Sequence, residues 1–290
     1  MKKPVFEGVG TAIVTPFQNG TIDYAVYDSL LDTQLAAGVD ALIVAGTTGE
    51  SATLSDAEKL SLLAHTIQFT AGRCRIIAGT GSNDTAHSLE LSRVACSLGA
   101  DALLLVTPYY NKCTQEGLVR HFCTVADGIT CPAIVYNVPS RTGMDIRTET
   151  CIRLSEHPNL NGVKEACGDV VKAAELVRAC GEDFFVWSGN DDQTVPLMSV
   201  GAKGVISVLS NVLPTETLQM THAGLHGDFK TAGKLQLRLL PLIRALFAEV
   251  NPIPVKAALE LQGFAVGDPR LPLTPAEEKT VERLRELMTA

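Results

Sequence analysis

The stretch Asn161-Gly162-Val163-Lys164-Glu165-Ala166 has the pattern of a short buried strand that carries a lysine in its middle. Helical patterns lie on both sides of it, over Thr148 to Ser155 and over Asp169 to Cys180. A strand between two helices is usually parallel and buried on both faces, and such strands are nearly all apolar. Lys164 therefore needs an explanation, because burying an ammonium costs several kcal/mol unless the charge is paired, neutralised or used in a covalent step.

Two interpretations of Lys164 follow. It either forms a structural ion pair with Glu165 or another acid, or it is a Schiff-base lysine whose amine is kept partly neutral by desolvation. A lysine free in water has a pKa near ~10.4, whereas a nucleophilic amine at neutral pH needs a pKa of roughly 7–8. The difference is about 4 kcal/mol, which is within reach of burial.

The alternation of strand and helix extends along most of the chain. Eight short strand patterns over about 225 residues are each followed by a helical one, as expected of a parallel sheet covered by helices and of a closed (β/α)₈ barrel. An open, doubly wound sheet would need a glycine-rich phosphate turn after the first strand, where Thr15-Pro16-Phe17 stands. The barrel is therefore the predicted fold. The strands are expected near residues 9–14, 40–45, 75–78, 102–106, 133–136, 161–166, 184–187 and 204–207.

The strand patterns end at about Pro214, and the remaining segments are helical, with a break at Asn251-Pro252-Ile253-Pro254. We therefore expect an α/β protein with two parts. A (β/α)₈ TIM barrel over residues 1–224 carries the site, and a C-terminal helical domain covers residues 225–290.

The composition is that of a globular protein, with 46% hydrophobic and 19% charged residues in a chain of 290. The net charge of −8 is spread along the chain, and no basic run could follow a phosphate backbone, which argues against a nucleic-acid partner. No apolar run reaches the ~18 residues of a membrane span, and no signal-type apolar core follows Met1-Lys2-Lys3-Pro4. We expect a cytoplasmic protein that binds neither nucleic acid nor membrane.

The eight cysteines are scattered, without a C-x-x-C pair and without the Cys/His spacing of a zinc site. Eight thiols without a disulfide framework suit a reducing compartment. Most are expected to be small core residues, and no metal site is predicted.

The polar residues expected at the carboxyl ends of the strands form one group, because the active site of such a barrel lies at that end. They include a lysine, tyrosines, hydroxyl side chains and one arginine, which suits carbonyl chemistry on an anionic substrate. Hydroxyl groups donate and accept protons, and an arginine binds a carboxylate through two parallel hydrogen bonds. Each residue alone has an ordinary structural explanation, but their common position favours a site. The group is Thr47, Thr48, Tyr109, Tyr110, Tyr136, Arg141, Lys164, Ser188, Gly189, Asn190, Ile206 and Ser207.

Three of these segments carry a family resemblance: Gly46-Thr47-Thr48-Gly49-Glu50, Tyr136-Asn137-Val138-Pro139-Ser140-Arg141-Thr142-Gly143 and Gly162-Val163-Lys164-Glu165-Ala166. The chain resembles the 4-hydroxy-tetrahydrodipicolinate synthases (dihydrodipicolinate synthases) nearly end to end. The similarity includes Ser188-Gly189-Asn190-Asp191-Asp192 and the segment Asn251 to Lys256. These proteins are class I aldolase-like enzymes of the pyruvate-dependent lyase superfamily.

The resemblance implies roles for four catalytic residues. Lys164 forms the Schiff base with pyruvate, and Tyr136 is the proton donor and acceptor. Thr47 and Tyr110 complete the proton relay, and in this family Tyr110 reaches into the site of the neighbouring subunit.

It also implies how the substrates are held. Thr48 and the backbone at Ile206 bind the pyruvate end, with Gly189 nearby, and Arg141 receives the carboxylate of L-aspartate-4-semialdehyde. The product is 4-hydroxy-tetrahydrodipicolinate, on the diaminopimelate route to lysine. The family further implies a homotetramer built as a dimer of dimers, and no cofactor.

Two alternatives remain open. N-acetylneuraminate lyase and other 2-keto-acid aldolases share the scaffold, the lysine and the tyrosine, but generally not Ser140-Arg141-Thr142-Gly143. The other alternative is a non-catalytic binding barrel. It is disfavoured because every position needed for the chemistry is filled.

Lysine-sensitive members of the family have an effector pocket at a subunit interface. By comparison with those members, a histidine is expected at position 56 and a glutamate at position 87. This chain has Asp56 and His87 instead. That glutamate would pair with the amine of the effector, and His87 cannot do so equally well. We therefore expect weak or absent inhibition by lysine. The pocket residues that match the family are Ser51, Ala52, Asn83 and Tyr109.

Overall fold

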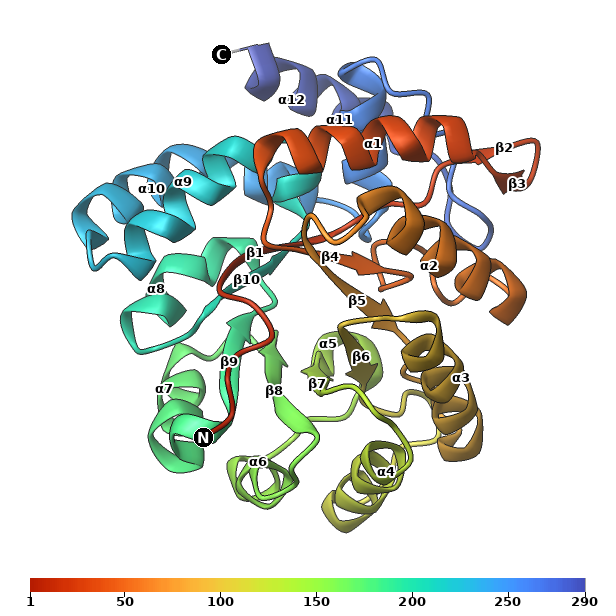
Figure 1. Ribbon diagram of the computed structural model, residues 1–290. Helices are drawn as coiled ribbons and strands as arrows, with labels where there is room; N and C mark the ends of the chain where they lie inside the picture. The colour runs from red at the N-terminus through yellow and green to blue at the C-terminus, as the bar shows by residue number, and fades with distance from the viewer. Residues whose placement is uncertain (290) are drawn as a thin grey trace.

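A computed structural model describes residues 1–289. Eight parallel strands close into a barrel in the order β1-β10-β9-β8-β7-β6-β5-β4, and helices surround them (Figure 1). The predicted (β/α)₈ barrel is confirmed, and the open sheet is excluded because β1 pairs with both β4 and β10. The strands are β1 (Gly8–Ala12), β4 (Ala41–Val44), β5 (Arg75–Gly79), β6 (Ala102–Val106), β7 (Ala133–Asn137), β8 (Leu160–Glu165), β9 (Phe185–Ser188) and β10 (Gly204–Ser207).

The outer helices begin where the sequence provides capping side chains. Asp23, Asp84 and Asp169 each accept hydrogen bonds from first-turn N–H groups, and Ser55 with Glu58 forms a capping box. The helices are α1 (Tyr24–Ala37), α2 (Asp56–Thr70), α3 (Thr85–Leu98), α4 (Gln115–Asp127), α6 (Thr148–Ser155), α7 (Val170–Cys180), α8 (Thr194–Ser199) and α9 (Pro214–Leu225).

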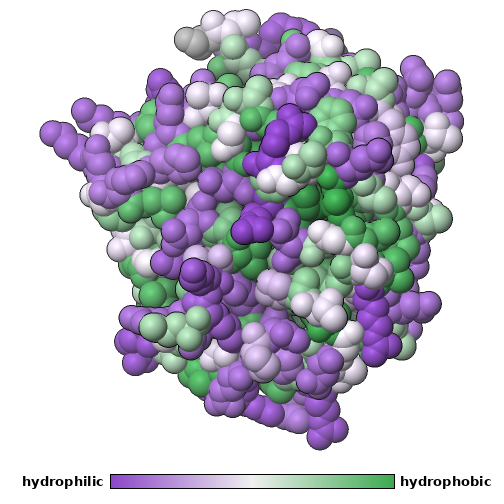
Figure 2. Space-filling model, viewed as in Figure 1, coloured by the Kyte–Doolittle hydropathy of each residue, from purple (hydrophilic) through white to green (hydrophobic). Residues whose placement is uncertain are grey.

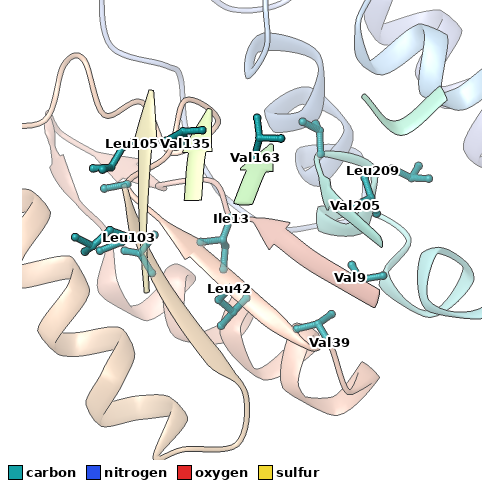
Figure 3. Packing of buried hydrophobic residues seen from close by; sticks show 14 of the residues in the cluster. Val9, Ile13, Val39, Leu42, Leu103, Leu105, Val135, Val163, Val205 and Leu209 are labelled. Carbon is teal, nitrogen blue, oxygen red and sulfur yellow. The ribbon is translucent and has the colours of Figure 1, made fainter. Parts of the chain in front are cut away.

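The strands bury two apolar layers, because successive side chains of a strand point to opposite faces. One layer fills the barrel interior and includes Ile43, Ile77, Leu104, Ile134 and Trp187. The other packs beneath the helices, and Figure 3 shows part of it. Labelled there are Val9, Ile13, Val39, Leu42, Leu103, Leu105, Val135, Val163, Val205 and Leu209.

The same alternation places Lys164 inside the barrel. Lys164 is the register partner of Tyr136 on β7 and of Trp187 on β9, and both of these belong to the interior layer. Glu165 follows directly in the chain and therefore faces the helices. A shift of one residue in register would exchange the positions of the lysine and the glutamate.

The N-terminal segment covers the end of the barrel that lies opposite to the carboxyl ends of the strands. It crosses in front of β9 in Figure 1. Lys2 Nζ donates to the carbonyl oxygens of Ser155, His157 and Leu160. Phe6 stacks on Trp187 with the ring centroids 5.4 Å apart, and Trp187 Nε1 donates to the Phe6 carbonyl. Both rings are buried and fill the interior below Lys164.

Three helices follow the barrel: α10 (Phe229–Leu246), α11 (Ile253–Leu261) and α12 (Glu278–Thr289). The first packs on α8 and α9, and α12 packs on both α10 and α11. The helical character of this region is as predicted, whereas the boundary at residues 224 and 225 stays a prediction.

Several short elements were not predicted. A hairpin joins β2 (Phe17–Gln18) to β3 (Thr21–Ile22) through Asn19 and Gly20, which both have positive φ, as a two-residue type I′ turn requires. The one-turn helix α5 (Pro139–Thr142) follows β7. The remaining elements are 3₁₀ turns: η1 (Gly181–Asp183), η2 (Asp191–Gln193) and η3 (Leu209–Asn211).

The cysteines differ from the expectation of eight free, mostly buried thiols. Cys96 at the end of α3 and Cys131 just before β7 form a disulfide across 35 residues of sequence. Of the six free cysteines only Cys151 is buried. The disulfide was not predictable because α3 and β7 are brought together by the barrel, and the spacing of the two cysteines has no recognisable pattern.

The surface is mixed in polarity. On the face seen in Figure 2, hydrophilic residues are spread over the whole area, with hydrophobic ones gathered to the right of the centre. No helix within residues 1–289 is long and apolar enough to cross a membrane.

A buried ion pair ties α11 to the loop after β4. Lys256 is 2% exposed, and its Nζ lies 2.9 Å from Glu50 Oε1 and 3.3 Å from the Thr15 carbonyl. Glu50 Oε2 accepts from the Arg270 backbone N–H. Glu50 closes the loop that carries Thr47 and Thr48, so the C-terminal helices hold a candidate site loop in place.

The substitution K256M is expected to destabilise the protein by about 3–5 kcal/mol, because it leaves the Glu50 carboxylate buried without its partner. Urea unfolding measures the change, and the double variant E50Q/K256M should lose clearly less than the sum of its single variants. K279A, which removes an exposed partner of Glu277, is the matched control and should leave the unfolding midpoint unchanged. A wild-type midpoint for K256M would contradict this account.

Candidate active site

Lys164 lies at the carboxyl end of β8 and is 6% exposed. Its Nζ is 4.2 Å from the centroid of the Tyr136 ring. Glu165 accepts from Asn137 Nδ2 at 2.9 and 3.0 Å and from the Cys167 N–H, and Lys172 lies 3.6 Å from it. Among residues 1–289 no carboxylate forms an ion pair with Lys164. The interpretation of Lys164 as part of a structural ion pair is therefore wrong.

The environment of Lys164 favours the neutral amine. Burial lowers the pKa of Lys164 to about 7, the Asp191 carboxylate opposes this, and the Arg141 guanidinium adds to it. An amine with this pKa is largely unprotonated just above neutral pH, whereas an ordinary lysine is almost fully charged there. The value lies in the range that a nucleophilic lysine needs.

Tyr136 is buried beside this amine. Burial raises the pKa of Tyr136 to about 12, although Arg141 and the Thr47 side chain both lower it. The phenol is thus protonated at neutral pH and can donate a proton to an oxygen or nitrogen at Lys164. Thr47, on the loop after β4, extends this pair of proton-carrying groups toward the opening of the barrel.

Gly189 makes room for the lysine. A β-carbon built on Gly189 would lie 2.7 Å from Ala166 Cβ and 3.1 Å from Lys164 Cε. The Gly189 N–H donates to the Glu165 carbonyl at 2.7 Å, which fixes the backbone at this close approach. The predicted place of Gly189 near the pyruvate end stays a prediction. Ile206 is buried on β10 with its side chain in the interior layer.

Asn251 connects two predicted substrate-binding residues and was not itself predicted. Its Nδ2 donates to Thr48 Oγ1 at 3.0 Å, and its carbonyl accepts from Arg141 Nη2 at 3.1 Å. Asn251 precedes α11 and stands 203 positions after Thr48 in the chain, yet it orients the Thr48 hydroxyl. The motif around Asn251 was noted in the sequence, but only as a helix break and as part of the resemblance.

A cavity of about 330 Å³ opens beside these groups. Thr47, Arg141 and Asn251 line it. So do Ser51, Ala52, Lys59 and Tyr109, which include residues of the predicted effector pocket. The Arg141 guanidinium can bind an anionic group, and the Lys164 amine with the Tyr136 and Thr47 hydroxyls can act on a carbonyl group. Together they suit a small anionic substrate that contains a carbonyl group.

Tyr110 does not take part in the site of this chain. It is 93% exposed, has a φ of 69°, and does not line the cavity, whereas Tyr109 is 40% exposed and does. A positive φ is uncommon for a residue with a bulky side chain. Of the predicted relay, this chain by itself brings together Tyr136, Thr47 and Lys164.

Of the predicted effector residues, Ser51, Ala52 and Tyr109 line this cavity, whereas Asn83 and His87 do not. Asn83 Nδ2 donates to the Tyr109 carbonyl at 3.2 Å. His87 Nε2 is 2.7 Å from Asp56, and Lys59 Nζ is 3.4 Å from the same carboxylate. Asp56 is therefore already paired with two side chains.

No group of three or more His, Cys, Asp or Glu side chains in residues 1–289 could hold a metal ion. A buried, unpaired lysine beside a tyrosine at the carboxyl end of a (β/α)₈ barrel is the arrangement of a Schiff-base-forming aldolase or lyase. The comparison with known proteins narrows this class. The chain belongs to the dihydrodipicolinate synthetase family, whose model matches residues 5–290.

Relatives and solved structures agree with this assignment. The 4-hydroxy-tetrahydrodipicolinate synthase of Exiguobacterium sibiricum is 53% identical over 285 residues, covering 98% of this chain and 97% of that protein. The dihydrodipicolinate synthase structure from Thermotoga maritima has a TM-score of 0.96 at 46% identity and covers 98% of both chains. The structure from Cyanidioschyzon merolae, solved with lysine bound, has a TM-score of 0.96 at 42% identity and covers 99% of this chain and 98% of its own. These relatives favour the synthase interpretation over N-acetylneuraminate lyase and over a binding barrel.

The substitution G189A is expected to destabilise the protein by about 1–3 kcal/mol, because the added methyl group overlaps Ala166 and the Lys164 side chain. It should also displace the amine, which competitive acetylation of Lys164 followed by mass spectrometry would detect as an altered pH midpoint. G233A, in α10 with open space around it, is the control and should be neutral or stabilising by up to about 1 kcal/mol. Equal behaviour of the two variants would refute the packing argument.

Proposed function

We propose that this protein condenses pyruvate with L-aspartate-4-semialdehyde to give 4-hydroxy-tetrahydrodipicolinate, in the diaminopimelate route to lysine. The observation that carries the proposal is Lys164, a buried amine without an ion pair whose pKa is lowered by burial to about 7 beside Tyr136. The names of the relatives support the same reaction.

The reaction begins at the Lys164 amine. The neutral Nζ attacks the keto carbon of pyruvate, and the carbonyl oxygen takes up a proton. Loss of water then leaves a cationic iminium, which makes the methyl carbon acidic, and loss of a proton gives an enamine. Tyr136 supplies and removes these protons, and Thr47 passes them on, since both hydroxyls donate and accept.

The second substrate reacts at the enamine. Arg141 binds the carboxylate of the semialdehyde, and the enamine carbon attacks its aldehyde carbon, whose oxygen is protonated. The amine of the semialdehyde then closes the ring at the iminium carbon and displaces the Lys164 amine. Thr48, the backbone at Ile206 and the space at Gly189 hold the pyruvate end throughout. No step needs a cofactor, because the covalent Schiff base provides the electron sink.

The proposal includes a homotetramer, a dimer of dimers in which Tyr110 completes the relay in the neighbouring subunit. Tyr110 is nearly fully exposed beside Tyr109 and held at a positive φ, which is what a residue directed at a partner would show. We place the reaction in the cytoplasm because both substrates are small polar metabolites that cellular metabolism supplies.

Borohydride reduction in the presence of pyruvate is expected to fix pyruvate covalently on Lys164, which peptide mass spectrometry identifies. K164A should give no adduct and lose about 10³-fold or more in turnover with the two proposed substrates. K172R changes a lysine on the outer face of the same region and should retain both adduct and turnover. Turnover of K164A near the wild-type rate, or faster cleavage of N-acetylneuraminate than condensation by the wild type, would sink the proposal.

L-Lysine is expected to inhibit weakly or not at all. The chain carries Ser51, Ala52, Asn83 and Tyr109 at the expected pocket positions, but the Asp56 carboxylate is paired with His87 and Lys59. The ammonium of Lys59 lines the same cavity and repels a cationic effector. Steady-state assays with increasing lysine test this, with the lysine-binding Cyanidioschyzon merolae enzyme as positive control. Half-maximal inhibition at low millimolar lysine would show the expectation to be wrong.

A further inference from the structure

Asp191 is a buried carboxylate next to the site that the mechanism above does not use. It opens η2 and is 1% exposed. Its Oδ1 accepts from Ser207 Oγ at 2.6 Å, and its Oδ2 accepts from the N–H groups of Val208 and Leu209 at 2.9 and 3.1 Å. An ionised carboxylate accepts and does not donate, so three donors aimed at it match the charged form. Burial raises the pKa of the Asp191 carboxyl group, and these three hydrogen bonds oppose that rise.

These hydrogen bonds fix the end of β10. Ser207 directly follows Ile206, and its Oγ also accepts from the Ser210 N–H at 2.9 Å. The next anchor is Asn211, which accepts from the Val14 N–H and donates to the Ala12 carbonyl of β1. The backbone that holds the pyruvate end therefore leads into a turn whose shape depends on the Asp191 carboxylate.

Asp191 is itself held from outside the barrel. Gln236 of α10 donates to the Asp191 carbonyl at 3.0 Å and accepts from the Val195 N–H at 3.1 Å. Thr194 Oγ1 donates to the same carbonyl. The position of the carboxylate is thus set by contacts that do not involve Lys164.

Four ionisable or charged groups surround the reacting amine. Tyr136 from β7 is a neutral phenol, Arg141 from α5 is a cation, and Glu165 on the other face of β8 is engaged by Asn137 and Lys172. Asp191 follows two residues after Gly189, where an added β-carbon would lie 3.1 Å from Lys164 Cε, and it is the carboxylate whose charge acts on Lys164. The iminium formed on Lys164 is a cation in a buried place, which requires a negative charge nearby.

We propose that Asp191 is a positioning residue for the Schiff base, which holds the end of β10 and supplies the fixed negative charge that balances the buried iminium. The inference rests on the proposed function, because the iminium forms only with a keto acid. The same three hydrogen bonds hold the end of β10 and favour the ionised form of the Asp191 carboxyl group.

The charge of Asp191 sets the direction in which the pKa of Lys164 should change. A negative charge favours the protonated amine, so removing it lowers the pKa of Lys164 below its value of about 7. Turnover with pyruvate falls as the pH drops through the pKa of the free amine. Loss of the Asp191 charge should therefore move that fall to lower pH, while the rate at the plateau decreases because the iminium is less stable.

D191N tests this with little change in shape. The pH profile of kcat/KM for pyruvate should move its acid-side midpoint down by roughly one pH unit, and kcat should fall about 10-fold or more. S207A is the matched control, since it removes one hydrogen bond from Asp191 and keeps the charge, and it should retain the wild-type midpoint. An unchanged midpoint in D191N, or the same shift in S207A, would overturn the inference.

A further variant keeps the test decisive if D191N does not fold. D191E keeps the negative charge but displaces it. Its acid-side kcat/KM midpoint should stay near the wild-type value while kcat falls. A midpoint lowered by about one pH unit in D191E would count against the charge effect. Borohydride trapping on the wild type separates the two proposals. If the wild type forms no pyruvate adduct, the proposed function fails; if it forms one and D191N keeps the wild-type midpoint, only the role of Asp191 fails.

Discussion

The burial of one uncompensated amine governs the arrangement of this molecule. Lys164 stands inside a closed barrel, and the desolvation of its ammonium is what lowers its pKa to about 7. The surrounding residues keep that environment dry and leave room for the side chain. Phe6 and Trp187 fill the interior below it, Tyr136 packs against it, and Gly189 gives it space. A single carboxylate in ion-pair contact would reverse the effect, and the alternation of side chains along β8 prevents this by sending Glu165 outward.

The charges near the site are divided between two sides of the barrel wall. On the outer side Glu165 is held by Asn137 and Lys172, so that its charge is satisfied away from the amine. On the inner side Arg141 and Asp191 act on Lys164 with opposite signs. The pKa of the amine is thus set by burial together with these neighbouring charges.

The C-terminal helices take part in the site although they lie outside the barrel. Asn251 orients the hydroxyl of Thr48 and holds Arg141, Lys256 anchors Glu50 at the end of the same loop, and Gln236 supports Asp191. Each contact joins the part of the chain after residue 228 to a segment that follows the carboxyl end of a strand. The predicted division into two domains therefore does not divide the functional unit.

The sequence by itself determined the barrel, the helix starts and the unusual status of Lys164. These depend on local signals: the alternation of apolar runs, the Ser55–Glu58 capping box, and a cation within a buried strand. Only the tertiary structure decided that Asn137 and Lys172 engage Glu165, that Asn251 and Asp191 reach the site, that Cys96 bonds Cys131, and that Tyr110 does not line the cavity of its own chain. The physical reason is that these contacts join residues far apart in the chain, and no periodicity or spacing records which distant side chains the closing of the barrel brings together.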